Sequence, residues 1–309
     1  MKNVNLDSVN NYKLSLAVFE SESPKGVVQI VHGMQEHKER YYTFAEFLIK
    51  NGFHVVVSDM RGHGEDAPIL GHIADKKGEK LLIEDQRNIY KYIKEQYGDL
   101  PIILLGHSMG SIISRVLMQT NSKDYAKVVL SGYVSPNPAS GAAVILGNMQ
   151  ANKKKSSKFL ANLALGPYTK SVKDRRTDLD WLSYNEDNVD EYIKDPLSGI
   201  DFTNGSFSAL FHLLNAMGKA KRYKDVNEEL PILLVGGEDD PCTGGAKGRA
   251  NSRKVLEKAK FKNISAITYQ HMRHEILNEK DNQKVYQDIL NFLNKYMIES
   301  PEQSGFLIY

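Results

Sequence analysis

Cysteine is almost absent from this chain of 309 residues, in which Cys242 is the single one. An intrachain disulfide and a cysteine-rich metal site are therefore excluded. Long apolar runs are missing too: no window approaches eighteen apolar residues, and the polar start, residues 1–7, has no apolar signal core. We therefore expect a soluble, cytoplasmic protein.

Charge of one sign is not in excess either. The 40 lysines and arginines offset 38 aspartates and glutamates, which leaves a net charge of +2. This balance does not indicate binding to nucleic acid, and we expect no nucleic-acid partner. The length suits one large α/β domain with an insertion or two ordinary domains, and either one buries a full hydrophobic core.

A strand, a sharp turn and a helix are predicted near residue 108. The apolar run 102–105 is typical of a buried parallel strand, and apolar residues return at helical spacing from Ile112. Between them lies Gly-His-Ser-Met-Gly. A nucleophile elbow needs small residues two positions before and after its serine, because the strained turn brings neighbouring backbone close together, and Gly106 and Gly110 meet that need. Ser108 is therefore the candidate nucleophile.

The rest of the chain alternates predicted strands and helices. Strands are expected at 11–20, 27–31, 53–58, 128–130, 232–235 and 264–269, and helices at 41–50, 81–97, 250–259 and 286–296. This alternation at short spacing indicates an α/β fold, in which helices cover both faces of a mostly parallel central sheet.

The alternation stops between residues 134 and 226. That stretch has helical segments at 142–149, 159–165 and 209–217, punctuated by prolines such as Pro167 and without strand alternation. We interpret it as an inserted helical cap, so that the core consists of residues 1–133 and 227–309. Ligands of such folds bind beyond the carboxyl ends of the strands, where a cap would cover the serine.

Two backbone N–H groups are candidates for stabilising an oxyanion. Met109 follows the serine at a helix N-terminus, where its N–H can face developing negative charge. Met34 follows His32-Gly33 at the end of a strand that precedes the elbow unit, which is where this architecture has its second donor.

A serine hydroxyl needs a base, and the base needs a carboxylate that fixes its tautomer. The strand 232–235 is followed by Glu238, Asp239 and Asp240. We choose Asp240, which lies farthest past the strand and just before the rigid Pro241, with Asp239 as the main alternative.

The base is expected after the last strand, which is followed by His271 and His274. We choose His274, since it directly precedes a helical restart that would anchor it, and keep His271 as the alternative. Three other histidines, His32, His63 and His107, are expected to make structural hydrogen bonds in turns.

The loop after strand 53–58 holds two opposite charges, Asp59 and Arg61. We expect them to pair and brace the loop rather than to take part in chemistry, because a brace must be rigid whereas a catalytic group must reach the serine.

Together these motifs resemble the monoacylglycerol lipase and lysophospholipase branch of the α/β-hydrolase family, which is related to serine aminopeptidases. The resemblance covers nearly the whole chain and rests on Val31-His32-Gly33-Met34, Glu36-His37, Arg40-Tyr41, Asp59 to Gly64, Gly106 to Gly110, Asp180 to Ser183, Asp195 to Leu197, Gly237 to Pro241 and His274-Glu275. It implies an α/β-hydrolase fold with Ser108 as nucleophile, Asp240 and His274 as triad partners, and the Met34 and Met109 amides as oxyanion hole. Glu65-Asp66 departs from the family pattern, in which one residue and then serine follow Gly-His-Gly.

Such a site predicts hydrolysis of a small-molecule acyl ester through an acyl-enzyme, without a metal or an organic cofactor. Apolar residues of the cap either line an acyl-chain tunnel or only hold the cap together; they are Phe159, Leu160, Leu163, Leu165, Phe207, Leu210, Phe211 and Leu214.

Three further features leave two interpretations each. The lysines Lys153, Lys154, Lys155 and Lys158 are interpreted as a solvated face, with contact of the cap to anionic lipid head groups as the alternative. Cys242 either lies near the pocket and makes the enzyme sensitive to thiol reagents, or is buried and inert. The protein is expected to be a monomer or a homodimer.

Two other functions remain open. A serine aminopeptidase of the proline-releasing kind would need cap carboxylates to hold a substrate amine, and Glu186, Asp187, Asp190 and Glu191 are available, although they read as a solvated loop. A ligand-binding receptor would keep the fold and use the cap as a sensing lid. The intact elbow, acid and histidine favour an ester hydrolase, acting on monoacylglycerols, lysophospholipids or similar acyl esters.

Overall fold

The computed structural model describes residues 1–295. The expectation that the tail, residues 300–309, frays lies outside the described residues, as does the end of the helix predicted at 286–296.

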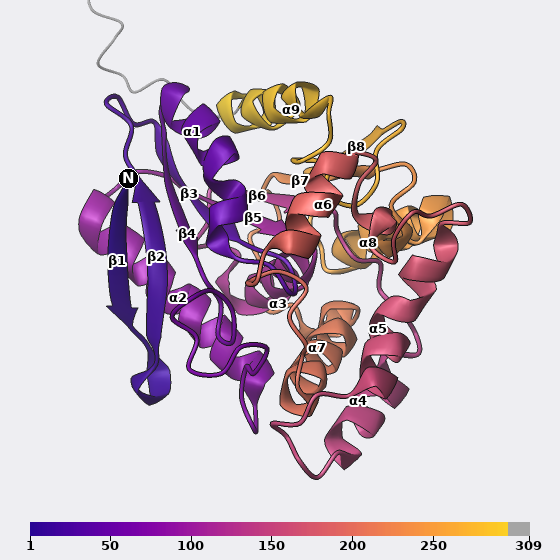
Figure 1. Ribbon diagram of the computed structural model, residues 1–309. Helices are drawn as coiled ribbons and strands as arrows, with labels where there is room; N and C mark the ends of the chain where they lie inside the picture. Colours follow the sequence, from indigo (N-terminus) through magenta and orange to yellow (C-terminus); the bar gives the residue numbers. More distant parts are fainter. Residues whose placement is uncertain (296–309) are drawn as a thin grey trace, which may run out of the picture.

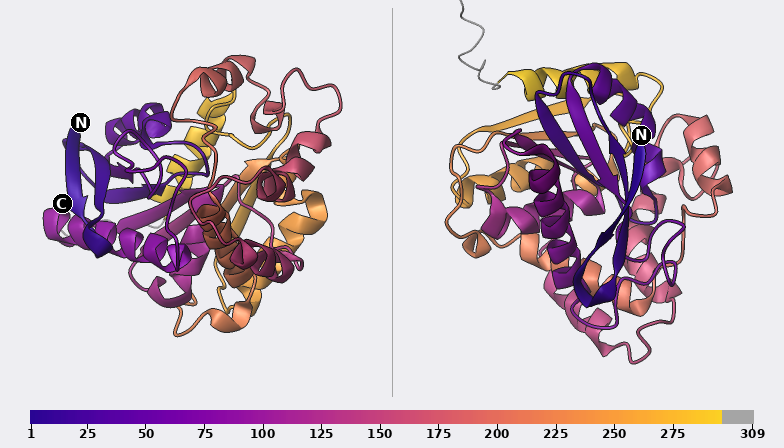
Figure 2. Two further views of the ribbon diagram at one scale, coloured as in Figure 1. Left: turned by 60° about the horizontal axis from the view of Figure 1, so that its bottom comes forward. Right: turned by 90° about the vertical axis from the view of Figure 1, so that its left-hand side faces the viewer.

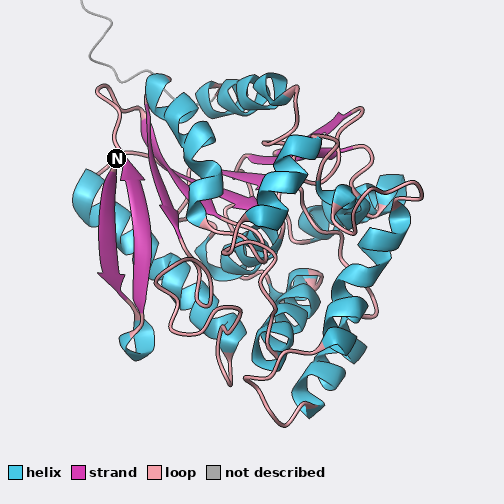
Figure 3. Ribbon diagram, viewed as in Figure 1, coloured by secondary structure: helices cyan, strands magenta, loops and turns pink. Residues whose placement is uncertain are grey.

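One mixed sheet of eight strands forms the centre of the molecule, with the order β1-β2-β4-β3-β5-β6-β7-β8 (Figure 3). Its strands are β1 (Lys2–Asp7), β2 (Lys13–Phe19), β3 (Gly26–Val31), β4 (Phe53–Ser58), β5 (Ile102–His107), β6 (Lys127–Ser131), β7 (Ile232–Gly237) and β8 (Ile264–Tyr269). The pairings β1–β2 and β2–β4 are antiparallel and all the others are parallel. The predicted fold class, α/β with a mostly parallel sheet, is confirmed.

Helices pack on both faces of this sheet (Figure 1). The helices are α1 (Tyr42–Lys50), α2 (Gly78–Tyr97), α3 (Met109–Asn121), α4 (Ser140–Met149), α5 (Lys158–Ser171), α6 (Glu186–Lys194), α7 (Asn204–Met217), α8 (Gly245–Lys258) and α9 (Asn282–Asn294). Apolar residues of α1 and α9 pack with one face of the strands, and those of α2, α3 and α8 with the other face. The central strands are apolar on both sides because helices cover both faces.

The chain changes direction across the sheet at β3. Helix α1 leads from β3 to β4 on one side, whereas α2 leads back past β3 to β5, and β3 pairs with both strands. The loops that follow β3 and β5 therefore leave the sheet next to each other, in register at Val31 and Gly106. In open α/β sheets a crevice forms at such a reversal of strand order.

Residues 134–226, between β6 and β7, hold the helices α4 to α7; an isolated bridge between Ser156 and Thr203 is their one recorded β-pairing within the described chain. In Figure 1, α4, α5 and α7 lie together at the end of the molecule away from α1 and α9. Helix α5 runs through Pro167, where an interruption was expected. Residues 186–191, which read as a solvated loop, begin α6, whose apolar Val189 and Tyr192 are buried.

Two features at the N-terminal side of the sheet differ from the expectation. The polar start forms the edge strand β1, which faces the viewer in the right-hand view of Figure 2. The predicted pairing of Asp59 with Arg61 is wrong: Arg61 Nε donates to Asp85 at 2.6 Å, and Asp59 pairs with Lys38. The buried Asp85 lies on α2, so this charge pair required a partner that is distant in the sequence.

Within the part of the chain that the structure describes, no helix is both long enough and apolar enough to cross a membrane.

Candidate active site

Ser108 lies in a strained turn between β5 and α3. Its φ of 51° and ψ of −117° define a backbone conformation that residues other than glycine rarely adopt. A Cβ atom on Gly106 would lie 2.4 Å from the Gly110 carbonyl oxygen, and one on Gly110 would lie 2.0 Å from that of Val31. Both positions therefore require glycine, for the steric reason that the sequence motif suggested.

The loop after β3 lies beside this turn. A Cβ atom on Gly33 would be 3.1 Å from the Cβ of Ser108, and both Met34 and Met109 line the cavity that contains Ser108. Among the described residues, neither the Met34 N–H nor the Met109 N–H has a hydrogen-bond partner. The Gly33 N–H, by contrast, donates to the Glu36 carboxylate. The two N–H groups singled out from the sequence thus have no hydrogen-bond partner in residues 1–295, and both residues line the cavity of Ser108.

His274 and Asp240 form a buried pair. His274 Nδ1 lies 3.0 Å from Asp240 Oδ2, and the other carboxylate oxygen accepts the Cys242 N–H at 2.8 Å. His274 Nε2 is buried without a hydrogen-bond partner in residues 1–295, and the ring lines the cavity of Ser108. Because Asp240 holds Nδ1, the free Nε2 is the ring atom available to a reacting hydroxyl.

The alternatives considered for acid and base lie elsewhere. Asp239 and Glu238 are exposed, and the Asp239 carboxylate accepts the Tyr184 hydroxyl at 3.1 Å. His271 is exposed and does not line the cavity.

The charge of the Asp240 carboxylate controls the protonation of the histidine. Burial lowers the pKa of His274, but the charge and hydrogen bond of the Asp240 carboxylate, together with the contacts of Cys242, outweigh burial, so that the pKa lies well above 6.5. The neighbouring His107 ring is 4.9 Å from that of His274. Burial, reinforced by the charge of His274, lowers the pKa of His107 well below 6.5, which leaves the His107 ring neutral.

The cavity around Ser108 is mostly apolar and has an empty volume of about 730 Å³. Of the apolar residues proposed for an acyl-chain tunnel, three line this cavity: Leu165, Leu210 and Leu214. Leu163, Phe211 and Leu214 line a second, adjoining hollow, while Leu160 and Phe207 are buried in the core and Phe159 is 60 % exposed.

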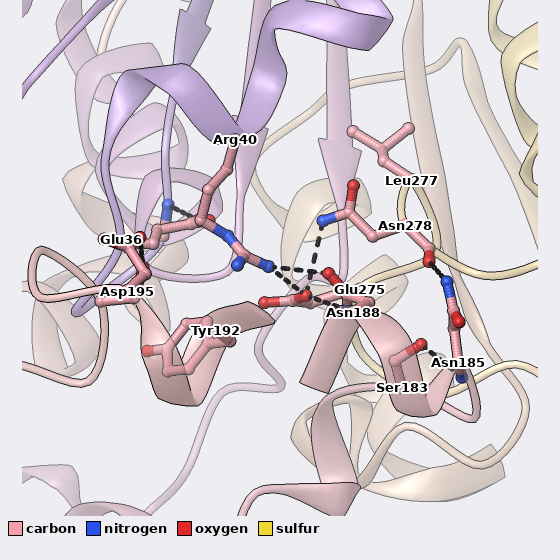
Figure 4. Close-up of polar contacts among 12 residues, drawn as sticks. Glu36, Arg40, Ser183, Asn185, Asn188, Tyr192, Asp195, Glu275, Leu277 and Asn278 are labelled. Carbon is pink, nitrogen blue, oxygen red and sulfur yellow. Dashed lines mark hydrogen bonds and ion pairs between the residues drawn. The ribbon is translucent and has the colours of Figure 1, made fainter. Parts of the chain in front are cut away.

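Two groups of residues at this site received no role from the sequence. The Trp181 ring lies 5.1 Å from the ring of His274, and only the fold brings these two positions together. Glu36, Arg40 and Glu275 form a buried ionic cluster beside the cavity (Figure 4). All three residues belong to the sequence motifs described above, but the sequence did not indicate that their charges pair with one another.

A metal ion has one plausible ligand set in the described residues. Asp240, Cys242 and His274 offer ligand atoms that lie within 4.8 Å of one another. His274 Nδ1 and Asp240 Oδ2 are already hydrogen-bonded to each other. Burial raises the pKa of the Cys242 thiol to about 11, and a thiol must lose its proton to bind a metal ion, so this set does not favour a cation.

Most of the lysine run and two apolar residues of α4 are exposed. Lys154 and Lys155 are exposed, whereas Lys153 Nζ donates to the Gly147 and Asn148 carbonyl oxygens at the end of α4. Ile145 and Met149 on α4 are also exposed. Contact of this region with a membrane surface, and the monomeric or dimeric state, stay predictions.

The eight-stranded sheet and its helices have the fold of the α/β-hydrolases. A highly thermostable carboxyl esterase from Bacillus coagulans, crystallised with glycerol, superposes with a TM-score of 0.88 over 96% of this chain and 99% of that one, at 24% identity. Residues 22–281 match the family model described as serine aminopeptidase, S33, and the chain belongs to this family.

Curated relatives agree with this assignment. The monoacylglycerol lipase of Mycolicibacterium smegmatis is 26% identical over 278 residues, which cover 89% of this chain and 90% of that protein. The human monoglyceride lipase is 29% identical over 275 residues, with coverage of 84% and 80%. The protein is thus an esterase- and lipase-like α/β-hydrolase.

Proposed function

We propose that this protein hydrolyses carboxylic esters of acyl chains, as a monoacylglycerol lipase, lysophospholipase or related carboxylesterase. Ser108 is the nucleophile, His274 the base and Asp240 the acid that orients it, while the Met34 and Met109 amides form the oxyanion hole. One observation carries the proposal: Ser108 and the free Nε2 of a histidine held by a buried aspartate line the same apolar cavity.

The reaction follows from these groups. His274 Nε2 accepts the Ser108 proton as the hydroxyl oxygen bonds to the ester carbon, and the two amides donate to the oxygen that becomes negative. The C–O bond to the alcohol then breaks as His274 returns the proton to the leaving oxygen. Water, deprotonated by the same nitrogen, attacks the acyl-enzyme, releases the carboxylic acid and restores Ser108.

We propose that residues 134–226 act as the cap that selects the acyl chain. Support comes from Leu165, Leu210 and Leu214, which belong to this segment and line the cavity of Ser108. A mostly apolar wall favours an alkyl chain over a polar acyl group. The relatives named as monoacylglycerol lipases point to the same substrate class.

The aminopeptidase alternative finds less support. Glu186, Asp187 and Glu191 are exposed, Asp190 pairs with Arg176 at 2.6 Å, and none of the four lines the cavity. The acidic residues that do line it, Glu36 and Glu275, are paired with Arg40.

The test is hydrolysis of p-nitrophenyl esters from acetate to palmitate, beside proline and alanine p-nitroanilides, by the wild type and by Ser108→Ala. We expect a preference for one range of acyl length and a loss of at least about 10³-fold in kcat for Ser108→Ala. Cleavage of anilides without ester turnover would instead support the peptidase, and absence of both activities would support a receptor. Turnover that survives in Ser108→Ala would contradict the proposed nucleophile.

A further inference from the structure

The loop that carries Met34 is held on one side by the buried Glu36. The Glu36 carboxylate accepts the Gly33 N–H, the Tyr41 hydroxyl at 2.7 Å and Arg40 Nε at 3.2 Å. The position of Gly33, directly before Met34, is thereby fixed from within the same loop and by the short turn Lys38–Tyr41 that precedes α1.

The other side of the loop is held from outside the core. The Gln35 carbonyl oxygen accepts the Tyr192 hydroxyl at 2.7 Å and the Gly199 N–H at 2.8 Å, and Gln35 Nε2 donates to the Ile200 carbonyl oxygen. Tyr192 lies on α6, so these contacts join the inserted segment 134–226 to the loop beside the nucleophile.

Gln35 has a φ of 60°, in the left-handed region that residues other than glycine seldom occupy. A conformation of this kind persists only where surrounding contacts enforce it. The bonds to the Gln35 carbonyl supply that enforcement. The Met34 N–H belongs to the Gly33–Met34 peptide group, whose carbonyl oxygen lies 2.7 Å from His32 Nδ1, and a rotation of Gln35 would shift the Met34 backbone through the peptide group that joins these two residues. Contacts made by α6 therefore fix the residue that directly follows Met34, and with it the place of the Met34 backbone beside Ser108.

The Tyr192 ring is itself fixed in place. It is buried, and the Arg40 guanidinium lies 4.8 Å from its centroid. Arg40 also bonds to Glu275 and, at 3.2 Å, to Asn188 Oδ1 of α6 (Figure 4). His37 Nε2 and Asp195 Oδ2, 2.6 Å apart, add a further link between the loop and this segment.

We propose that Tyr192 is a positioning residue, whose hydroxyl bond to the Gln35 carbonyl holds the Met34 N–H in the orientation that stabilises the oxyanion. This inference rests on the proposed function. It makes α6 part of the catalytic apparatus, in addition to any role of the inserted segment in covering the acyl chain.

The test compares Tyr192→Phe with Tyr223→Phe. Tyr223 is a matched control, because its hydroxyl also donates to a backbone carbonyl, that of Met217 at 3.3 Å, while its side chain does not line the cavity. In Tyr192→Phe we expect kcat for the best p-nitrophenyl ester to fall about 10- to 100-fold with KM within about twofold. Tyr223→Phe should leave both constants within about twofold of the wild type.

A second readout separates positioning from a general structural effect. A trifluoromethyl ketone forms a tetrahedral adduct with the serine, so its affinity should fall by the same factor as kcat/KM. Equal adduct affinity in Tyr192→Phe and the wild type, or equal losses in the two Tyr variants, would overturn the inference.

A second variant covers the case that Tyr192→Phe does not fold. Gln35→Gly keeps the carbonyl that accepts the Tyr192 hydroxyl, but it removes the side-chain bond to Ile200 and frees the backbone of the loop, so a smaller loss of kcat and adduct affinity than in Tyr192→Phe is expected. Unchanged constants in this variant would also contradict the inference. Failure of the proposed function is distinct, because the wild type would then lack Ser108-dependent ester turnover.

Discussion

The Glu279 carboxylate accepts a hydrogen bond of 2.7 Å from the Ser183 hydroxyl, and so joins the segment before α9 to the segment that precedes α6. The same buried carboxylate also accepts the N–H groups of Tyr184, Asn185 and Arg273. Arg273 directly precedes His274, so a single side chain holds both the entry to α6 and the loop of the candidate base.

Glu279→Ala is therefore expected to lower the free energy of unfolding by about 2–4 kcal/mol, because several buried donors lose their acceptor. Urea unfolding followed by circular dichroism measures this loss. Glu257→Ala, which removes an exposed partner of Arg253, should cost about 0.5 kcal/mol or less. Equal losses in the two variants would refute the proposed importance of Glu279.

Gly110→Ala tests the steric requirement of the turn. The new methyl group would meet the Val31 carbonyl oxygen at 2.0 Å, so we expect a loss of about 1–3 kcal/mol in stability and at least a tenfold fall in ester turnover. Gly141→Ala on α4 is the control, since its nearest new contact is at 3.9 Å and alanine favours a helix. The interpretation of the turn fails if both variants match the wild type in stability and turnover.

Ester turnover should decline on the acidic side with a midpoint above pH 6.5. Burial lowers the pKa of His274, but the contacts of Asp240 and Cys242 together outweigh burial and raise this pKa. Only the neutral ring accepts the Ser108 proton, so activity is lost as the pH falls through that pKa. A profile of kcat/KM against pH measures the midpoint. In Asp240→Asn the residual activity should be about 10⁴-fold lower and its midpoint should move to lower pH. A midpoint that does not move would show that another group controls the profile.

Cys242 is expected to react slowly with thiol reagents. Burial raises the pKa of its thiol to about 11 from 9.0, so the reactive thiolate is about 100-fold scarcer than in an exposed cysteine at the same pH. Labelling with a disulfide reagent at pH 8, before and after unfolding in urea, measures the difference. Rapid labelling of the folded protein, with loss of turnover that Cys242→Ser prevents, would support the alternative of a thiol-sensitive enzyme.

Much of the fold was predictable from the sequence, because central strands and their helices leave local patterns. The run 102–105 before Gly106, and the apolar spacing after Ser108, predicted β5, the turn and α3. Strand β1 was missed although Val4 and Leu6 alternate with polar neighbours, because an edge strand of 6 residues gives only two apolar positions, too few for a clear pattern. Helix α6 was not predicted because most of its residues are charged or polar. Val189 and Tyr192 are the apolar residues that it buries against the rest of the protein.

The sequence by itself determined which chemical groups are present and the steric demands of the turn at Ser108, because these depend on residues adjacent in the chain. The pairing of His274 with Asp240 was expected from the order of the motifs, whereas only the tertiary structure decided that Arg61 pairs with Asp85 and the Gln35 carbonyl with Tyr192. Partners of this kind are selected by burial, where an unpaired charge or polar group is costly, and burial depends on how the whole chain packs.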